Sequence, residues 1–71
     1  MSKDFFGRCF FRVVEQADRS WACRRGQRDL AWFDELEDAI EHTSGMASID
    51  APSEVFVHHL DGRVRAVATF D

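Results

Sequence analysis

The sequence has no run of apolar residues near the ~20 that a membrane-spanning helix requires, so no transmembrane helix is expected. Residues 1–6 also lack the long apolar stretch and the small-residue cleavage site of a secretory signal. We therefore expect a cytoplasmic protein without membrane contact. At 71 residues, with 45% hydrophobic and 31% charged side chains, the chain is expected to fold as one small domain over residues 1–71.

Residues that support catalysis or metal binding are equally scarce. The two cysteines, Cys9 and Cys23, are too few for a disulfide framework, and both lie in strand-like segments where a thiol behaves as a small apolar group. No C-x-x-C or H-x-x-x-H spacing, glycine-rich phosphate loop or serine-centred elbow is present. His58 and His59 are adjacent on a strand, so their rings point to opposite faces. We expect no catalytic residue, no metal and no cofactor.

Charge is unevenly distributed along the chain. The net charge of −4 disfavours nucleic acid as a partner, because such binding depends on neutralising phosphates. Residues 1–33 nevertheless carry seven basic and four acidic side chains, whereas residues 34–54 carry seven acidic and no basic ones. The sequence therefore predicts a basic N-terminal part and an acidic middle.

The N-terminal half has the composition of three short strands. Residues 6–15, 21–25 and 28–33 are rich in aromatic and β-branched side chains, and short polar connections separate them. We expect an antiparallel meander. Alternation places Cys9, Phe11 and Val13 on the core side with Trp21 and Cys23, and Arg8, Phe10, Arg12 and Val14 on the opposite side.

A helix is predicted after the third strand. Asp34 and Glu37 have the spacing of an N-terminal capping box, in which Asp34 accepts from first-turn amides. Gly45 is a natural stop, with one further turn allowed at Met46 and Ala47, and Pro52 ends any helix before it. The apolar stripe of this helix consists of Leu36, Ala39, Ile40 and Thr43.

The C-terminal segment reads as a hairpin. Asp61-Gly62 separates two β-rich runs, residues 54–60 and 63–70, and predicts a two-residue type I′ turn. That register sets His59, Val57 and Val55 opposite Val64, Ala66 and Ala68 on the core side. It sets His58 and Phe56 opposite Arg65 and Val67 on the other side.

These elements predict an α+β fold with the order β-β-β-α-β-β. We expect two layers, with one helix on one face of an antiparallel sheet of four to five strands. The expected core contains Phe11, Val13, Trp21, Leu36, Ile40, Val55, Val57 and Ala66.

The sheet face without the helix is the predicted interaction face, since arginines there alternate with aromatic side chains. Such a set suits protein contacts, including a homodimer, and it also suits stacking and phosphate contacts with single-stranded nucleic acid. The acidic total favours the protein partner or a second copy. The expected residues of this face are Arg8, Phe10, Arg12, Arg24, Phe56, His58, Arg65 and Val67.

Three short motifs add a resemblance. They are the strand Trp21-Ala22-Cys23-Arg24-Arg25-Gly26, the helix segment Glu37-Asp38-Ala39-Ile40, and the hairpin from Val57-His58 to Asp61-Gly62-Arg63-Val64. In this order they resemble the small bacterial DUF2188 domains over roughly residues 9–67. The resemblance implies no established activity and no catalytic residues. We therefore expect an uncharacterised, non-enzymatic module that acts through protein contacts or self-association, with single-stranded nucleic-acid binding as the alternative.

Overall fold

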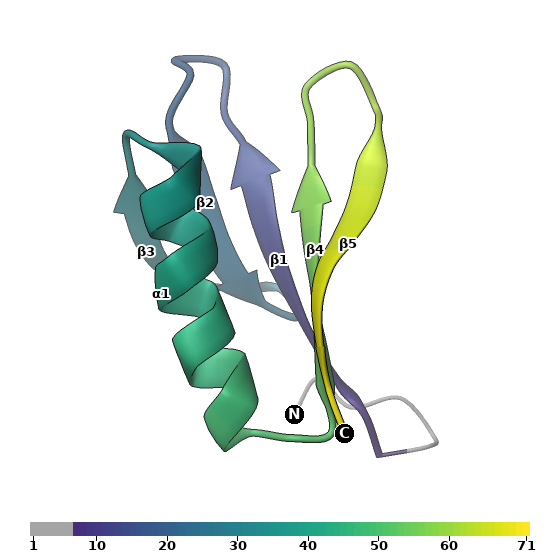
Figure 1. The fold of residues 1–71 in the computed structure, drawn as a ribbon. Coiled ribbons are helices and arrows are strands. Elements are labelled where there is room, and N and C mark those ends of the chain that lie inside the picture. Colours follow the sequence, from purple (N-terminus) through teal and green to yellow (C-terminus); the bar gives the residue numbers. More distant parts are fainter. Residues whose placement is uncertain (1–6) are drawn as a thin grey trace.

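The computed structural model describes residues 7–71, which form five strands and one helix (Figure 1). The predicted α+β class and the β-β-β-α-β-β order are confirmed. Phe6, expected in the first strand, lies outside the described residues. The elements are β1 (Cys9–Glu15), β2 (Trp21–Arg25), β3 (Arg28–Phe33), α1 (Leu36–Ile49), β4 (Ser53–His58) and β5 (Val64–Phe70).

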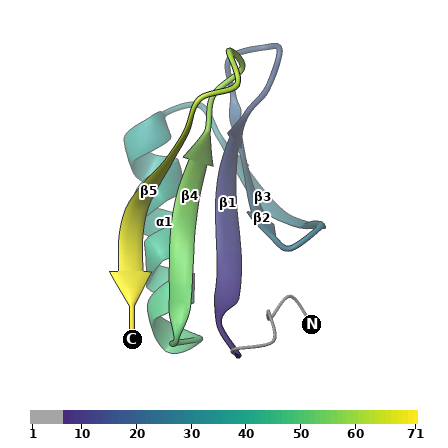
Figure 2. The same cartoon turned by 90° about the vertical axis from the view of Figure 1, so that its right-hand side faces the viewer.

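The five strands form one mixed sheet in the order β3-β2-β1-β4-β5. The first three strands make the predicted antiparallel meander, but β4 pairs with β1 in parallel, so the expected purely antiparallel sheet is wrong. Strands that run in the same direction need a connection of about a dozen residues or more between the end of one and the start of the next. The 14-residue α1 is that connection, because it carries the chain from the end of β3 back to the start of β4. The helix lies across one side of the sheet and leaves the other side open (Figures 1 and 2).

The helix differs from its prediction at both ends. Its N-cap is Glu35 rather than Asp34, and no side chain caps the first turn. It continues through Gly45 to Ile49, because Gly45 is exposed and the next turn buries Ala47 against the sheet. That burial offsets the roughly 1 kcal/mol that glycine costs within a helix. No helix in the described part of the chain is both long enough and apolar enough to span a membrane.

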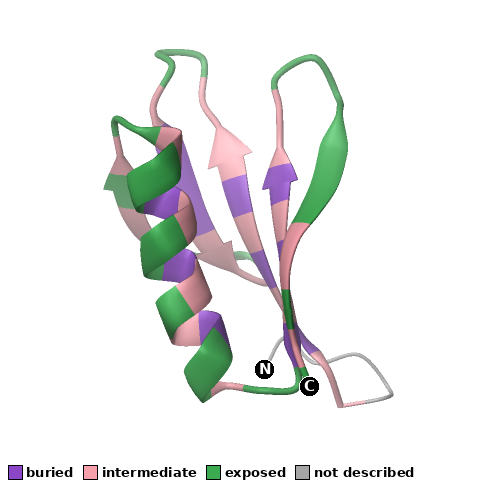
Figure 3. Cartoon of the chain, viewed as in Figure 1, coloured by how far each residue is buried: buried purple, intermediate pink, exposed green. Residues whose placement is uncertain are grey.

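The core lies between α1 and the strands β1, β2 and β4 (Figure 3). The predicted core residues Phe11, Val13, Trp21, Val55 and Val57 are buried there. Leu36 and Ile40, also predicted, are partly buried and pack against this cluster. Both cysteines are buried and unpaired, as predicted.

The hairpin between β4 and β5 closes through three residues, not two. The His59 amide donates to the Arg63 carbonyl at 2.8 Å, and the Gly62 amide donates to the His59 carbonyl at 3.0 Å. Gly62 has the predicted positive φ, +93°, but Asp61 does not have one, so the predicted type I′ turn is wrong. A turn followed by one left-handed residue is the usual three-residue hairpin loop. The Asp61 carboxylate supports it by accepting from the Arg63 amide at 3.0 Å.

This longer loop shifts the pairing of β4 and β5 by one residue, which exchanges the two faces of β5 next to the turn. Ala66, predicted in the core, is therefore exposed, and Arg65 lies on the helix side. A β-bulge at Val67 then absorbs the extra residue, so Val67 packs against the core. The observed pairs are His58 with Val64, Val57 with Arg65, Phe56 with Ala66 and, as predicted, Val55 with Ala68.

Candidate interaction face

The side of the sheet turned away from α1 carries the candidate site, and Figure 2 looks toward it. Strand registers and alternation determine which side chains share it. We call this surface the uncovered face. It consists of Phe10, Arg12, Val14, Ala22, Arg24, Asp29, Trp32, Glu54, Phe56, His58, Val64, Ala66 and Thr69.

The structure brings together five of the eight side chains expected on this face: Phe10, Arg12, Arg24, Phe56 and His58. Arg8 lies at its margin, just before β1, where it donates to the Ser53 carbonyl and to Asp71. Two expectations need correction, because the register shift places Arg65 on the helix side and the bulge turns Val67 toward the core.

Trp32 is the most exposed aromatic side chain of the face, at 59%, and sequence reasoning did not place it there. Arg25 of β2 pairs with Arg28 of β3. If this register continued without interruption, Trp32 would lie opposite Trp21 and face the core. A bulge between Cys23 and Arg24 instead sets it opposite Ala22. The bulge has no turn residue that would mark it in the sequence. Val64 (54% exposed) and Ala66 lie on the face because the three-residue hairpin loop shifts the register of β5.

The arginines of the uncovered face are held by their own chain. An Arg12 Nη2 donates to the Gly26 carbonyl at 2.6 Å. Arg24 Nε donates to Asp29 Oδ1, also at 2.6 Å, and forms an ion pair with it. The Asp29 carboxylate neutralises Arg24, whereas the Gly26 carbonyl leaves the Arg12 charge in place, so the face is less cationic than its sequence indicated.

The middle of the face combines two aromatic and two charged side chains on β1 and β4. The Phe10 and Phe56 rings lie 6.0 Å apart and are tilted by 46°. Phe10 pairs with Glu54, and Arg12 pairs with Phe56, in the parallel register. Among the described residues, Glu54 has no cationic partner and Arg12 has no carboxylate partner.

His58 lies in the same surface, flanked by Val14 on β1 and Val64 on β5. Burial of the ring, together with the nearby Arg12 charge, lowers the pKa of His58 below its ordinary value. The imidazole is therefore neutral at neutral pH, and it adds no charge to the face.

The lowered pKa of His58 predicts that acid destabilises the fold. The folded protein binds this proton more weakly than the unfolded chain, whose histidines titrate near pH ~6.5. The unfolding free energy therefore falls as the pH drops through that range. A His58→Gln variant should lose less stability than the wild type between pH ~7 and ~5, as measured by urea melts. His42→Gln, at an exposed helix position, is the control, and equal losses in the wild type and H58Q would contradict the prediction.

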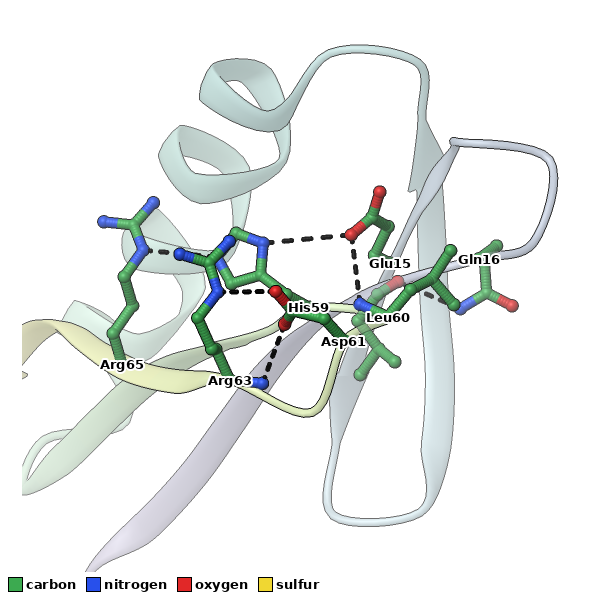
Figure 4. Close-up of polar contacts among 8 residues, drawn as sticks. Glu15, Gln16, His59, Leu60, Asp61, Arg63 and Arg65 are labelled. Atoms are coloured by element: carbon green, nitrogen blue, oxygen red, sulfur yellow. Dashed lines mark hydrogen bonds and ion pairs between the residues drawn. The ribbon is translucent and has the colours of Figure 1, made fainter.

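A polar cluster at the tip of the β4–β5 hairpin shows where Arg65 lies instead (Figure 4). Its Nε donates to His59 Nε2 at 3.4 Å, and His59 Nδ1 lies 3.8 Å from Glu15 Oε1. The same carboxylate oxygen accepts from the Leu60 amide at 3.1 Å. These contacts tie the hairpin to the end of β1, so we interpret the cluster as structural.

Both thiols lie inside the fold. Burial raises the pKa of the Cys23 thiol, which keeps it protonated and unreactive. Within residues 7–71, no three His, Cys, Asp or Glu side chains lie close enough together to hold a metal ion.

Comparison with known proteins gives one match. No curated protein and no solved structure matches the chain. The model of the family described as "Uncharacterized protein conserved in bacteria (DUF2188)" matches residues 11–70. This match spans all six elements except the first two residues of β1, and it agrees with the resemblance inferred from the three short motifs. The chain therefore belongs to the DUF2188 family of uncharacterised bacterial proteins.

Proposed function

We propose that this protein is a non-enzymatic interaction module that binds protein through its uncovered face. The observation that carries the proposal is the exposure of Trp32 and Val64 on the two edge strands of a sheet surface that α1 does not cover, with the Phe10–Phe56 pair on the inner strands between them. Large exposed apolar side chains gathered on one surface mark contact sites. Aromatic side chains and arginine are also enriched where proteins meet.

Single-stranded nucleic acid is the weaker candidate. Its binding needs aromatic platforms, which the face offers, and free cations that neutralise phosphates. Arg24 is paired with Asp29, Arg65 is on the helix side, and the Glu54 carboxylate lies on the same face as Arg12. The neutral His58 supplies no further charge. These contacts favour a protein partner.

Site-specific photo-cross-linking in bacterial cells that produce the full chain tests the proposal. A benzophenone amino acid replaces Trp32 in one variant and Ile49 in the matched control. Ile49 is also exposed and apolar, at 84%, but it lies at the end of α1, outside the uncovered face. We expect protein adducts from position 32 and none from position 49.

Two outcomes would overturn the proposal. Adducts at position 32 that disappear on nuclease treatment would identify nucleic acid as the partner. Equal adduct yields at the two positions, or none at either, would show that the uncovered face makes no specific protein contact.

A further inference from the structure

Four side chains at the middle of the uncovered face form a square on β1 and β4. Phe10 lies beside Glu54, and Arg12 lies beside Phe56, so the two aromatic residues occupy one diagonal and the two charged residues the other. The rings meet along their diagonal at 6.0 Å. We refer to this group as the central square.

Among residues 7–71, the charged corners of the central square have no partner of opposite charge. Glu54 is partly buried and has no cationic partner among the described residues. Arg12 uses one nitrogen for the Gly26 carbonyl, and a guanidinium has five N–H donors in all, so donors remain for a carboxylate. The opposite corners therefore carry a guanidinium with donors to spare and a carboxylate that no cation of residues 7–71 neutralises.

We propose that the uncovered face binds a second copy of this chain around a two-fold axis along the Phe10–Phe56 diagonal. This inference rests on the proposed function and names its partner. An axis in that position, between the two sheets, sets each phenylalanine against its own counterpart. It also exchanges the other two corners, so that Arg12 of each copy meets Glu54 of the other. Such reciprocal contacts are what a two-fold interface requires.

Charge selects this face over the helix side for contact between copies. Glu37, Asp38 and Glu41 are exposed on α1, and the helix itself contains no lysine or arginine, so two copies of α1 in contact would repel each other. On the uncovered face, two arginines balance two carboxylates. The four are Arg12, Arg24, Asp29 and Glu54.

The size of the surface also fits. A standard interface removes roughly 800 Å² per partner, about a sixth of the 4590 Å² accessible surface of this structure. One broad side of a five-stranded sheet can supply that area. Two sheets packed face to face would then lie about 10 Å apart, with a helix on each outer side.

A charge-swap experiment tests the inference on the full chain. Sedimentation equilibrium from micromolar to millimolar concentration should show a monomer–dimer equilibrium for the wild type. Arg12→Glu and Glu54→Arg should each raise the dimer dissociation constant by about tenfold or more, a loss of about 1.4 kcal/mol. The double variant should recover most of that loss, because the reciprocal pairs reform with exchanged signs.

Matched controls separate this effect from net charge and from folding. Arg28→Glu and Glu41→Arg change the net charge equally at exposed positions outside the uncovered face, and they should leave the dimer constant unchanged. Thermal melts by circular dichroism report whether each variant folds. If Arg12→Glu does not fold, Arg12→Gln and Glu54→Gln replace the reversals, and each should still weaken the dimer.

The outcomes distinguish this inference from the proposed function. A wild type that stays monomeric to millimolar concentration overturns the second copy as partner, whereas adducts at position 32 with a different protein would leave the proposed function intact. A dimer that the charge reversals do not weaken, or that the swap does not rescue, overturns the two-fold arrangement. A monomer without position-32 adducts overturns both.

Discussion

Replacing Phe11 with alanine is expected to destabilise the fold by about 3 to 5 kcal/mol. Phe11 is fully buried on β1, the central strand of the sheet, next to Cys9 and Val55 and under the Arg25 guanidinium, whose carbon lies 5.8 Å from the ring centroid. Truncation removes the apolar contacts and leaves a cavity that neighbouring strands cannot close. Small domains have only about 5 to 15 kcal/mol of stability in total, so much of it would be lost.

Urea denaturation followed by circular dichroism measures this change as a shift of the midpoint. Ile49→Ala is the matched control, since Ile49 is 84% exposed, and its effect should stay within about 0.5 kcal/mol. A loss below about 1 kcal/mol for Phe11→Ala would contradict the placement of β1 at the centre of the core.

Replacing Gly62 with valine is expected to cost about 1 to 3 kcal/mol. Gly62 has a φ of +93°, where a β-branched residue is strained, and the loop cannot relax without breaking the hydrogen bond from the Gly62 amide to His59. Open space surrounds the position, so the penalty comes from the backbone and not from a clash. The same urea melts measure it.

Gly45 provides the opposite test of a glycine. It lies within α1, and a Cβ built there meets nothing within 4 Å. Gly45→Ala should therefore stabilise the protein by about 1 kcal/mol, because alanine is the better helix former.

A Gly62→Val variant as stable as the wild type would show that the hairpin does not depend on the left-handed residue.

Local pattern predicted most of the elements and the central part of the core. Alternation in β1 placed Phe11 and Val13 correctly, since a strand paired on both sides has a strict two-residue period. The bounds of β2 and β3 also matched their prediction. The parallel pairing of β1 with β4 was not predicted, because the direction of a strand after a crossover depends on where the helix returns the chain to the sheet.

The candidate face was predicted well at its centre and poorly at its edges. Phe10, Arg12 and Phe56 lie on the two inner strands, where the predicted alternation holds. Trp32 and Arg65 lie on the edge strands β3 and β5, where a bulge in the pairing of β3 and the three-residue loop before β5 change which side chains face outward. Bulges are frequent at sheet edges, where only one neighbour constrains the register.

The sequence by itself determined the α+β class, the order of the elements, the buried thiols and the central aromatic and arginine residues, because each depends on composition or on a short period. Tertiary structure decided how those residues combine. The three-residue loop at Gly62 moved Arg65 away from the uncovered face and brought Val64 and Ala66 onto it. The parallel pairing of β1 with β4 placed Glu54 beside Phe10, which creates the central square. The β1–β4 pairing joins residues more than 40 positions apart, and no local pattern specifies the register between them.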